Sequence, residues 1–146
     1  MKKTIILAIV IPIASVVVAA AVAVTVFFTV IDPPLGPGKT DHVKMTVGES
    51  KYFTQAEIKS AMDCVLVYFR DHHKGSVMTD LWYDEATAKV VCKYNGYALD
   101  GKTIVFYSSS YAENPENAGD MDSDWGWVLQ RDSKTSPWHV TGEGFL

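Results

Sequence analysis

Residues 53–73 read FTQAEIKSAMDCVLVYFRDHH, and this stretch sets the architecture because it predicts one long helix. Thr54 can accept a hydrogen bond from the amide of Glu57, and the Glu57 carboxylate can reach back to Thr54, which is the pattern of a capping box. Gly75 provides a stop after the last turn. Apolar side chains recur at helical spacing and form a single face: Ile58, Ala61, Met62, Val65, Tyr68, Phe69 and His72. Such a helix must pack on a sheet or on another helix.

Runs rich in β-branched and aromatic residues predict the strands of the chain. Four strands are expected: 76–83, 103–111, 125–131 and 138–143. Residues 85–95 predict a second helix, because Asp84 is a good N-cap and Gly96 fits the position after the last turn. The run Val90-Val91-Cys92 would equally suit a strand, so the type of this element stays open. Residues 131–137 are expected to form the loop of a final hairpin.

This order of elements, a helix, a strand, a helix and three strands, predicts an α+β domain. The last three strands can form an antiparallel meander, and the helix that starts at Thr54 then covers one face of a curved antiparallel sheet. The arrangement is similar to the cystatin-like and NTF2-like group of folds, in reduced form.

The N-terminal segment from Thr4 to Ile31 contains no charged residue. As a helix it is long enough to cross a hydrocarbon core of about 30 Å. Lys2 and Lys3 precede it and would hold the N-terminus in the cytoplasm, so we expect a single-pass membrane protein with its C-terminal domain outside. A cleaved signal peptide is the alternative, because residues 21–23 have the small-x-small pattern of a cleavage site.

These features predict three parts of the chain. Residues 1–31 form a transmembrane anchor with a short cytoplasmic start, residues 32–40 form a linker with three prolines and two glycines, and residues 41–146 form the extracytoplasmic domain. Cys64 and Cys92 would face an exterior where disulfides are permitted, and the sequence leaves their pairing open.

Charge and motifs exclude several classes of function. The chain has 17 acidic against 13 basic side chains, and all the acidic ones follow the uncharged segment. We therefore expect the domain to bind neither nucleic acid nor an anionic membrane surface, since both require a basic face. A glycine-rich phosphate loop, G-x-S-x-G and H-E-x-x-H are all missing from the sequence, so no cofactor and no enzymatic activity is indicated.

Five residues near the C-terminal strands are candidates for a binding site: Tyr107, Tyr111, Trp125, Trp138 and His139. They would line a concave pocket or a platform for a carbohydrate. Packing beneath the first helix is the favoured interpretation, and Trp127 is predicted to be buried there. As a catalytic base, His139 would need a nucleophile beside it, and only generic hydroxyls such as that of Ser109 are at hand.

Asp120, Asp122 and Asp124 provide carboxylates at alternating positions, as at the start of a calcium loop. The EF-hand pattern fails, because Trp125 stands where glycine is required and Arg131 stands where glutamate is required. A looser calcium site is one hypothesis, and a solvated loop between two strands is the favoured interpretation.

A resemblance to a group of proteins rests on three segments: 81–85 (LWYDE), 122–133 (DSDWGWVLQRDS) and 137–140 (PWHV). They resemble uncharacterised membrane-anchored or exported proteins of Gram-positive anaerobes, over residues 52–145. The resemblance implies the fold and the location, and it implies no activity and no catalytic residues.

We therefore expect a membrane-anchored extracytoplasmic domain of non-enzymatic function that binds an extracytoplasmic protein or peptide, or assists a process of the cell envelope. A plain anchored spacer is a further option. The alternative is a small-ligand binder or weak enzyme that uses the cone-shaped cavity of an NTF2-like fold. A pocket ringed by Tyr and Trp with His139 or an acid inside would favour this alternative, and a filled core with an exposed aromatic patch would favour the first reading.

Overall fold

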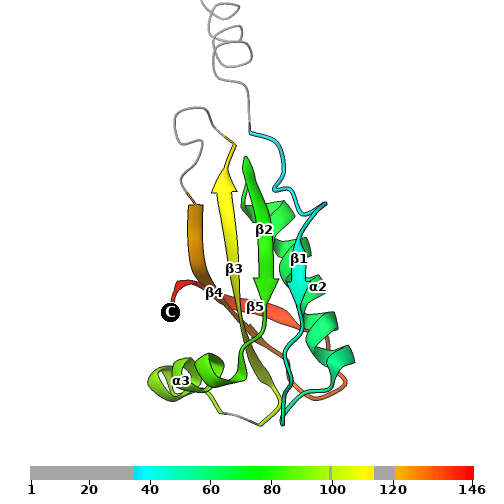
Figure 1. Cartoon of the computed structure of the whole chain (residues 1–146). Helices are drawn as coiled ribbons and strands as arrows, with labels where there is room; N and C mark the ends of the chain where they lie inside the picture. Colours follow the sequence, from blue (N-terminus) through cyan, green and yellow to red (C-terminus); the bar gives the residue numbers. More distant parts are fainter. Residues whose placement is uncertain (1–34, 99, 114–120) are drawn as a thin grey trace, which may run out of the picture. The chain divides into compact units, whose positions relative to one another are not determined.

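The computed structural model describes residues 35–98, 100–113 and 121–146. The expected anchor (1–31) lies outside these ranges, as does the start of the expected linker. Gly36–Leu146 forms one compact α+β unit (Figure 1). Its elements are β1 (Lys44–Thr46), α2 (Gln55–His72), β2 (Ser76–Trp82), α3 (Glu85–Asn95), β3 (Thr103–Ala112), β4 (Met121–Gln130) and β5 (His139–Phe145). Within the described ranges, neither helix is long and apolar enough to span a membrane.

The sheet is mixed, whereas the sequence predicted an antiparallel one. The strands follow the order β1-β2-β3-β4-β5, and β2 to β5 pair antiparallel as expected. The added strand β1 pairs parallel with β2, with Lys44 opposite Asp80. Sequence patterning missed β1 because its three residues are all exposed and show no alternation between apolar and polar.

The chain joins the domain before the predicted boundary at residue 41. The Gly38 amide donates to the carbonyl of Arg70 at 3.0 Å, and Lys39 forms a parallel bridge with Val77. The Lys39 ammonium also pairs with the Glu113 carboxylate at 2.6 Å. A fragment meant to fold should therefore begin at residue 35 or earlier.

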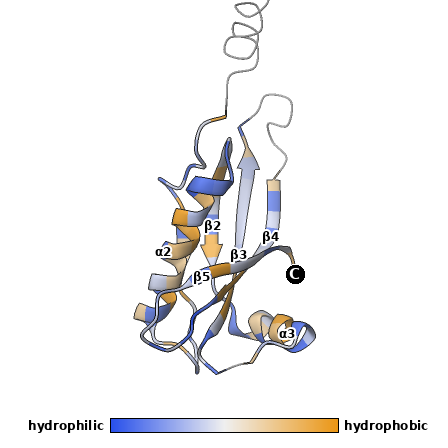
Figure 2. Ribbon diagram, turned by 180° about the vertical axis from the view of Figure 1, so that it is seen from behind, coloured by the Kyte–Doolittle hydropathy of each residue, from blue (hydrophilic) through white to orange (hydrophobic). Residues whose placement is uncertain are grey.

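Helix α2 begins with the predicted capping box. The Thr54 hydroxyl accepts from the Glu57 amide at 3.2 Å, and the Glu57 carboxylate accepts from the Thr54 amide at 2.9 Å. At the other end, the His73 amide donates to the carbonyl of Phe69, and Gly75 adopts a φ of 70°, which favours glycine. The apolar face of α2 is turned toward the sheet (Figure 2).

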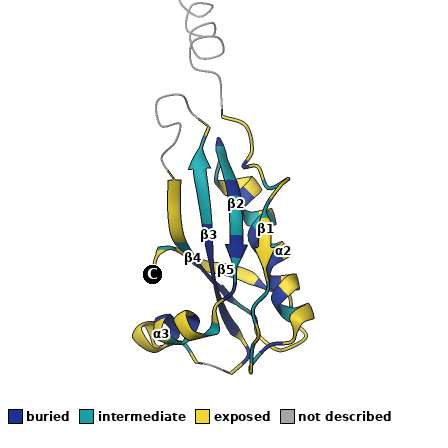
Figure 3. Cartoon of the chain, viewed as in Figure 1, coloured by how far each residue is buried: buried dark blue, intermediate teal, exposed yellow. Residues whose placement is uncertain are grey.

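The core lies between α2 and the sheet and is filled by large side chains. Trp127 is fully buried, as predicted, and it packs edge-on against Phe69 with 6.3 Å between ring centroids. Its indole N–H donates to the Ser108 hydroxyl at 2.8 Å, so the polar atom of this large side chain is satisfied. Figure 3 shows the buried residues concentrated in the central strands and on the inner side of α2.

The element at 85–95 is the helix α3, which resolves the ambiguity with a strand. The Asp84 carboxylate accepts from the amides of Ala86 and Thr87, and Gly96 lies in the left-handed region with a φ of 71°. Cys92 is buried on the inner side of α3, and Cys64 is half-buried on α2. Both thiols are free, so the open question of a disulfide is answered.

Strand β4 begins at Met121, four residues before the predicted start, so the expectation of a solvated loop is wrong for residues 121–124. Asp122 on β4 pairs with Ser110 on β3, although the Asp122 side chain is exposed. The pairing contains a bulge at this level, and Asp124 has a φ of 61°. The run of carboxylates hid this strand, because exposed acids are not typical of strands.

The outer face of β4 is covered at one point by the end of the chain. A Cβ atom added to Gly126 would lie 2.2 Å from the Cδ1 atom of Leu146. Gly126 is therefore a site of close approach, where a side chain on β4 would displace Leu146.

Candidate functional site

The five predicted site residues do not meet at one place. Trp138 is buried against Phe53, with 5.9 Å between their ring centroids, and is part of the core. Tyr111 is half-buried near the end of β3, opposite Met121. Trp125 faces the end of α2, Tyr107 lies on the opposite face of the sheet, and His139 is exposed at the start of β5. No single pocket ringed by these aromatic residues exists in the described ranges.

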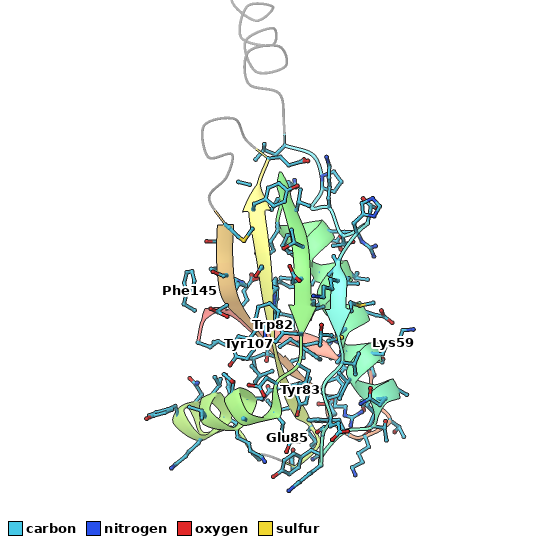
Figure 4. All side chains as sticks on the ribbon, in the orientation of Figure 1. Lys59, Trp82, Tyr83, Glu85, Tyr107 and Phe145 are labelled. Carbon is cyan, nitrogen blue, oxygen red and sulfur yellow. The ribbon has the colours of Figure 1, made fainter. Side chains whose placement is uncertain are left out.

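Tyr107 and Trp82 form a stacked pair on the face of the sheet away from α2 (Figure 4). Phe106 pairs with Trp127 on the α2 side, so its neighbour Tyr107 points the other way. Burial raises the pKa of the Tyr107 hydroxyl, and the nearby Asp84 carboxylate raises it further. The hydroxyl is buried without a partner among the described residues. It is closed to a ligand in this arrangement.

His73, at the end of α2, forms a bridge to Glu143 on β5. Its Nε2 atom lies 2.7 Å from a Glu143 carboxylate oxygen, and the Tyr68 hydroxyl donates to the other oxygen at 3.5 Å. The ring of His73 stacks on the ring of Phe69. It also packs edge-on against Trp127, with 5.3 Å between ring centroids. Burial raises the pKa of Tyr68.

The bridge leaves little room for chemistry. The cavity beside it has a volume of about 50 Å³, lined by Phe69, His73, Ser76, Ser110, Asp122, Trp125 and Trp127. The effect of the bridge is to attach the end of α2 to β5. Sequence patterning did not indicate this pair, because the contact joins residues 70 positions apart.

A second bridge is centred on Arg131, whose side chain is almost fully buried. Its guanidinium donates to the Glu57 carboxylate at 2.5 Å, to the Gly101 carbonyl through two N–H groups, and to the Lys134 carbonyl. It also lies 4.2 Å from the centre of the Trp138 ring. The Thr54 amide and the Arg131 guanidinium together lower the pKa of Glu57 to about 2. This bridge joins the start of α2 to two loops.

The largest cavity, which we name the distal cavity, has a volume of about 520 Å³ and opens to solvent. It is lined by Gly96, Tyr97, Ala98, Asp100, Lys102, Thr103, Gln130, Arg131, Asp132, His139 and Thr141. These residues come from the segment after α3, from the paired ends of β3 and β4, and from β5. Of the predicted site residues, only His139 lines it.

The distal cavity lies at the end of the sheet opposite to Gly36. The carbonyl of Gly36 accepts from Gly75 just before β2, and β2 starts opposite the last residue of β3. The cavity lies at the first residue of β3, where Thr103 pairs with Gln130. The full length of β3 therefore separates the two places.

Hydrogen bonds already shape the wall of the distal cavity. The Gln130 amide donates to the Thr103 hydroxyl at 3.4 Å, and an Asp100 carboxylate oxygen accepts from the Lys102 amide at 3.0 Å. Thr103 is buried, while Asp132 and His139 are exposed. The wall therefore offers hydroxyl, amide and carboxylate groups to a ligand. Sequence reasoning missed these residues, because they lie in four separate segments and form no motif.

The calcium hypothesis stays untested at its first residue, since Asp120 lies outside the described ranges. Asp122 lines the small cavity on the α2 side, and Asp124 follows two positions later on the same strand. Among the described residues, no group of three His, Cys, Asp or Glu side chains is arranged to hold a metal ion.

Comparison of the chain with protein-family models, with curated proteins and with solved structures found no match. The local chemistry is therefore the basis for assigning a function. Of the three places described, the two bridges pair their charged groups with each other, and the distal cavity offers the largest space together with a wall of polar groups.

Proposed function

We propose that this chain is a single-pass, membrane-anchored domain held outside the cytoplasm, where it binds a ligand without enzymatic chemistry. The uncharged segment from Thr4 to Ile31 and the preceding Lys2 and Lys3 support the anchor and its orientation. The observation that carries the binding role is the distal cavity, because it has the size of a ligand site and a wall of polar groups.

The position of the distal cavity fits this role. The proposed tether would join the domain at Gly36, and the cavity lies at the other end of the sheet. The cavity and the proposed point of attachment are therefore separated by the length of β3. The filled core beneath α2 also supports a scaffold rather than an internal reaction chamber.

We also propose that the fold is a reduced member of the cystatin-like and NTF2-like group, and that the chain belongs with anchored or exported proteins of Gram-positive anaerobes. One long helix lying on antiparallel strands β2 to β5 supports the first point. The cone-shaped cavity of that group has no equivalent in the described core, where Trp127, Phe69 and Phe106 fill the space.

The alternative is a small-ligand binder or a weak enzyme, and its enzymatic form is the second candidate. The observation that favours it is the presence of His139, Asp100 and Asp132 in one cavity. A base of this kind needs a nucleophile within hydrogen-bond reach, and His139 has no such partner among the described residues.

Cysteine labelling on intact cells tests the proposed function. Thr141→Cys places a thiol in the distal cavity, and Thr135→Cys places one in an exposed loop outside it; both are made with Cys64→Ser. A membrane-impermeant maleimide should label both on intact cells. Thr141→Cys should react more slowly in cells than in the purified chain, because bound ligand protects it, whereas Thr135→Cys should react equally in both.

Two results would count against the proposal. Labelling of Thr135→Cys only after lysis would place the domain in the cytoplasm. Equal labelling rates for Thr141→Cys in cells and in the purified chain would mean that the distal cavity stays empty where the protein works.

A further inference from the structure

The distal cavity is poorly suited to an anion, although Arg131 lines it. Four hydrogen bonds use four of the five N–H groups of this guanidinium, on Glu57, Gly101 and Lys134. Its charge is compensated by Glu57, and its side chain is only 3% exposed. A phosphate or carboxylate ligand would have to break this bridge to use it, and breaking a buried ion pair is costly.

The other charged residues of the cavity wall include both signs of charge. Asp100 and Asp132 are acidic, and Lys102 is basic. One oxygen of Asp100 already accepts from the Lys102 amide. A ligand with a strong charge of either sign would therefore meet a like charge as well as an opposite one. A neutral ligand avoids this conflict.

Neutral groups of the wall can both donate and accept hydrogen bonds. Thr103 is 95% buried, and its hydroxyl oxygen accepts from Gln130, which leaves its proton to donate. The Thr141 hydroxyl donates to the Val128 carbonyl, which leaves its oxygen to accept. The Gln130 carbonyl is a further acceptor. A wall that offers both donors and acceptors within a small space suits the hydroxyl groups of a ligand, because each hydroxyl can also donate and accept.

Tyr97 adds an apolar surface to this polar wall. Its side chain is half-buried against the core and lines the cavity, with small neighbours at Gly96 and Ala98. A flat ring beside polar groups suits a ligand with one C–H face and a rim of hydroxyls. The volume of about 520 Å³ lies in the range of small-molecule sites.

From these observations we infer that the distal cavity binds a neutral, hydroxyl-rich ligand, namely a saccharide, with its ring on Tyr97 and its hydroxyls on Thr103, Gln130 and Thr141. This inference rests on the proposed function, which assigns binding to the cavity. It goes further by naming the class of ligand and by excluding anions. A single sugar ring in an open cavity should bind weakly, with a Kd of about 1 mM.

The test is a titration of the full chain in lipid nanodiscs, with 13C-labelled threonine methyl groups as reporters. The probes are glucose, N-acetylglucosamine, inorganic phosphate and glycylglycine. We expect the two sugars to shift the methyl signals of Thr103 and Thr141 in a saturable way. Thr46 on β1 should not respond, and phosphate and glycylglycine should have no saturable effect on any of the three.

Matched variants separate the effect of the Thr103 hydroxyl on sugar binding from any effect on the fold. Thr103→Val keeps the shape and removes the hydroxyl, and should weaken sugar binding about tenfold, as expected for one lost hydrogen bond. Thr79→Val is the control, because its half-buried hydroxyl bonds the Ser109 carbonyl outside the cavity. It should leave the sugar affinity unchanged, with Thr141 as the reporter in both variants.

The outcomes distinguish this inference from the proposed function. Saturable shifts with phosphate or glycylglycine in place of the sugars would overturn the saccharide and leave the cavity as a binding site. Equal weakening by Thr79→Val would overturn the assigned contacts. Shifts with none of the probes would overturn the saccharide inference, while slower labelling of Thr141→Cys in cells would still support binding of another ligand.

Discussion

Replacing Arg131 with methionine should strongly destabilise the domain. The substitution keeps most of the side-chain length but removes four hydrogen bonds and the contact with the Trp138 ring. It leaves two loop carbonyls, those of Gly101 and Lys134, without their donor. Loss of one partner from a buried ion pair costs about 3–5 kcal/mol, which is a large part of the stability of a small domain.

The measurement is urea unfolding of residues 35–146, followed by circular dichroism. Glu57→Gln gives a matched second variant, because glutamine keeps the reciprocal cap but loses the charge. We expect it to cost about 2–3 kcal/mol, and we expect the double variant to cost less than the sum, by about 1–3 kcal/mol of coupling. An Arg131→Met domain within about 1 kcal/mol of the parent would refute the bridge as a stabilising element.

The same bridge predicts how stability depends on pH. The pKa of Glu57 falls from 4.5 to about 2 on folding, chiefly through the Thr54 amide and then through Arg131. The stabilisation is therefore complete above pH 4.5 and is lost as the pH falls toward 2. The full shift corresponds to roughly 3 kcal/mol, and screening of the partly exposed carboxylate reduces this to about 1–2 kcal/mol. Glu57→Gln should remove this part of the acid sensitivity, while Arg131→Met should remove only a portion of it.

Three further substitutions test the core and the cap in the same fragment. Thr54→Ala should lower the free energy of unfolding by about 1 kcal/mol, because the Glu57 amide loses its acceptor; an unchanged urea midpoint would contradict the cap. Trp127→Ala should cost about 3–5 kcal/mol and abolish the cooperative melt, whereas a retained transition would contradict the core position. Tyr107→Phe should raise the melting temperature, since it removes a buried hydroxyl without a partner at a gain of about 1 kcal/mol; a lower melting temperature would reveal a partner for that hydroxyl.

Local signals made most of the fold predictable. The capping box at Thr54 and the pair Asp84 and Gly96 fixed both helices to within a residue, because caps act over three or four positions. Strand β1 and the start of β4 were not predicted, because pairing with a neighbouring strand, rather than their own composition, makes them strands.

The candidate site was much less predictable than the fold. Arg131 attracted notice only as a mismatch to a calcium loop, although its burial organises two loops and the start of α2. The distal cavity combines residues after α3 with both strands of a distant hairpin. Such a site arises from tertiary packing, and it has no spacing that a pattern can detect.

The polar contacts of α2 have a consequence for how the chain acquires its structure. Glu57 meets Arg131, Cys64 meets the Trp138 carbonyl and Tyr68 meets Glu143, and these partners are 74, 74 and 75 residues apart. In an emerging chain, the apolar side chains of residues 55–72 therefore lack part of their cover until β4 and β5 are available. Long-range contacts of this kind slow folding and prolong the exposure of apolar surface that can aggregate. We expect a chain synthesised from its N-terminus to depend on protection by a chaperone until β5 closes the sheet.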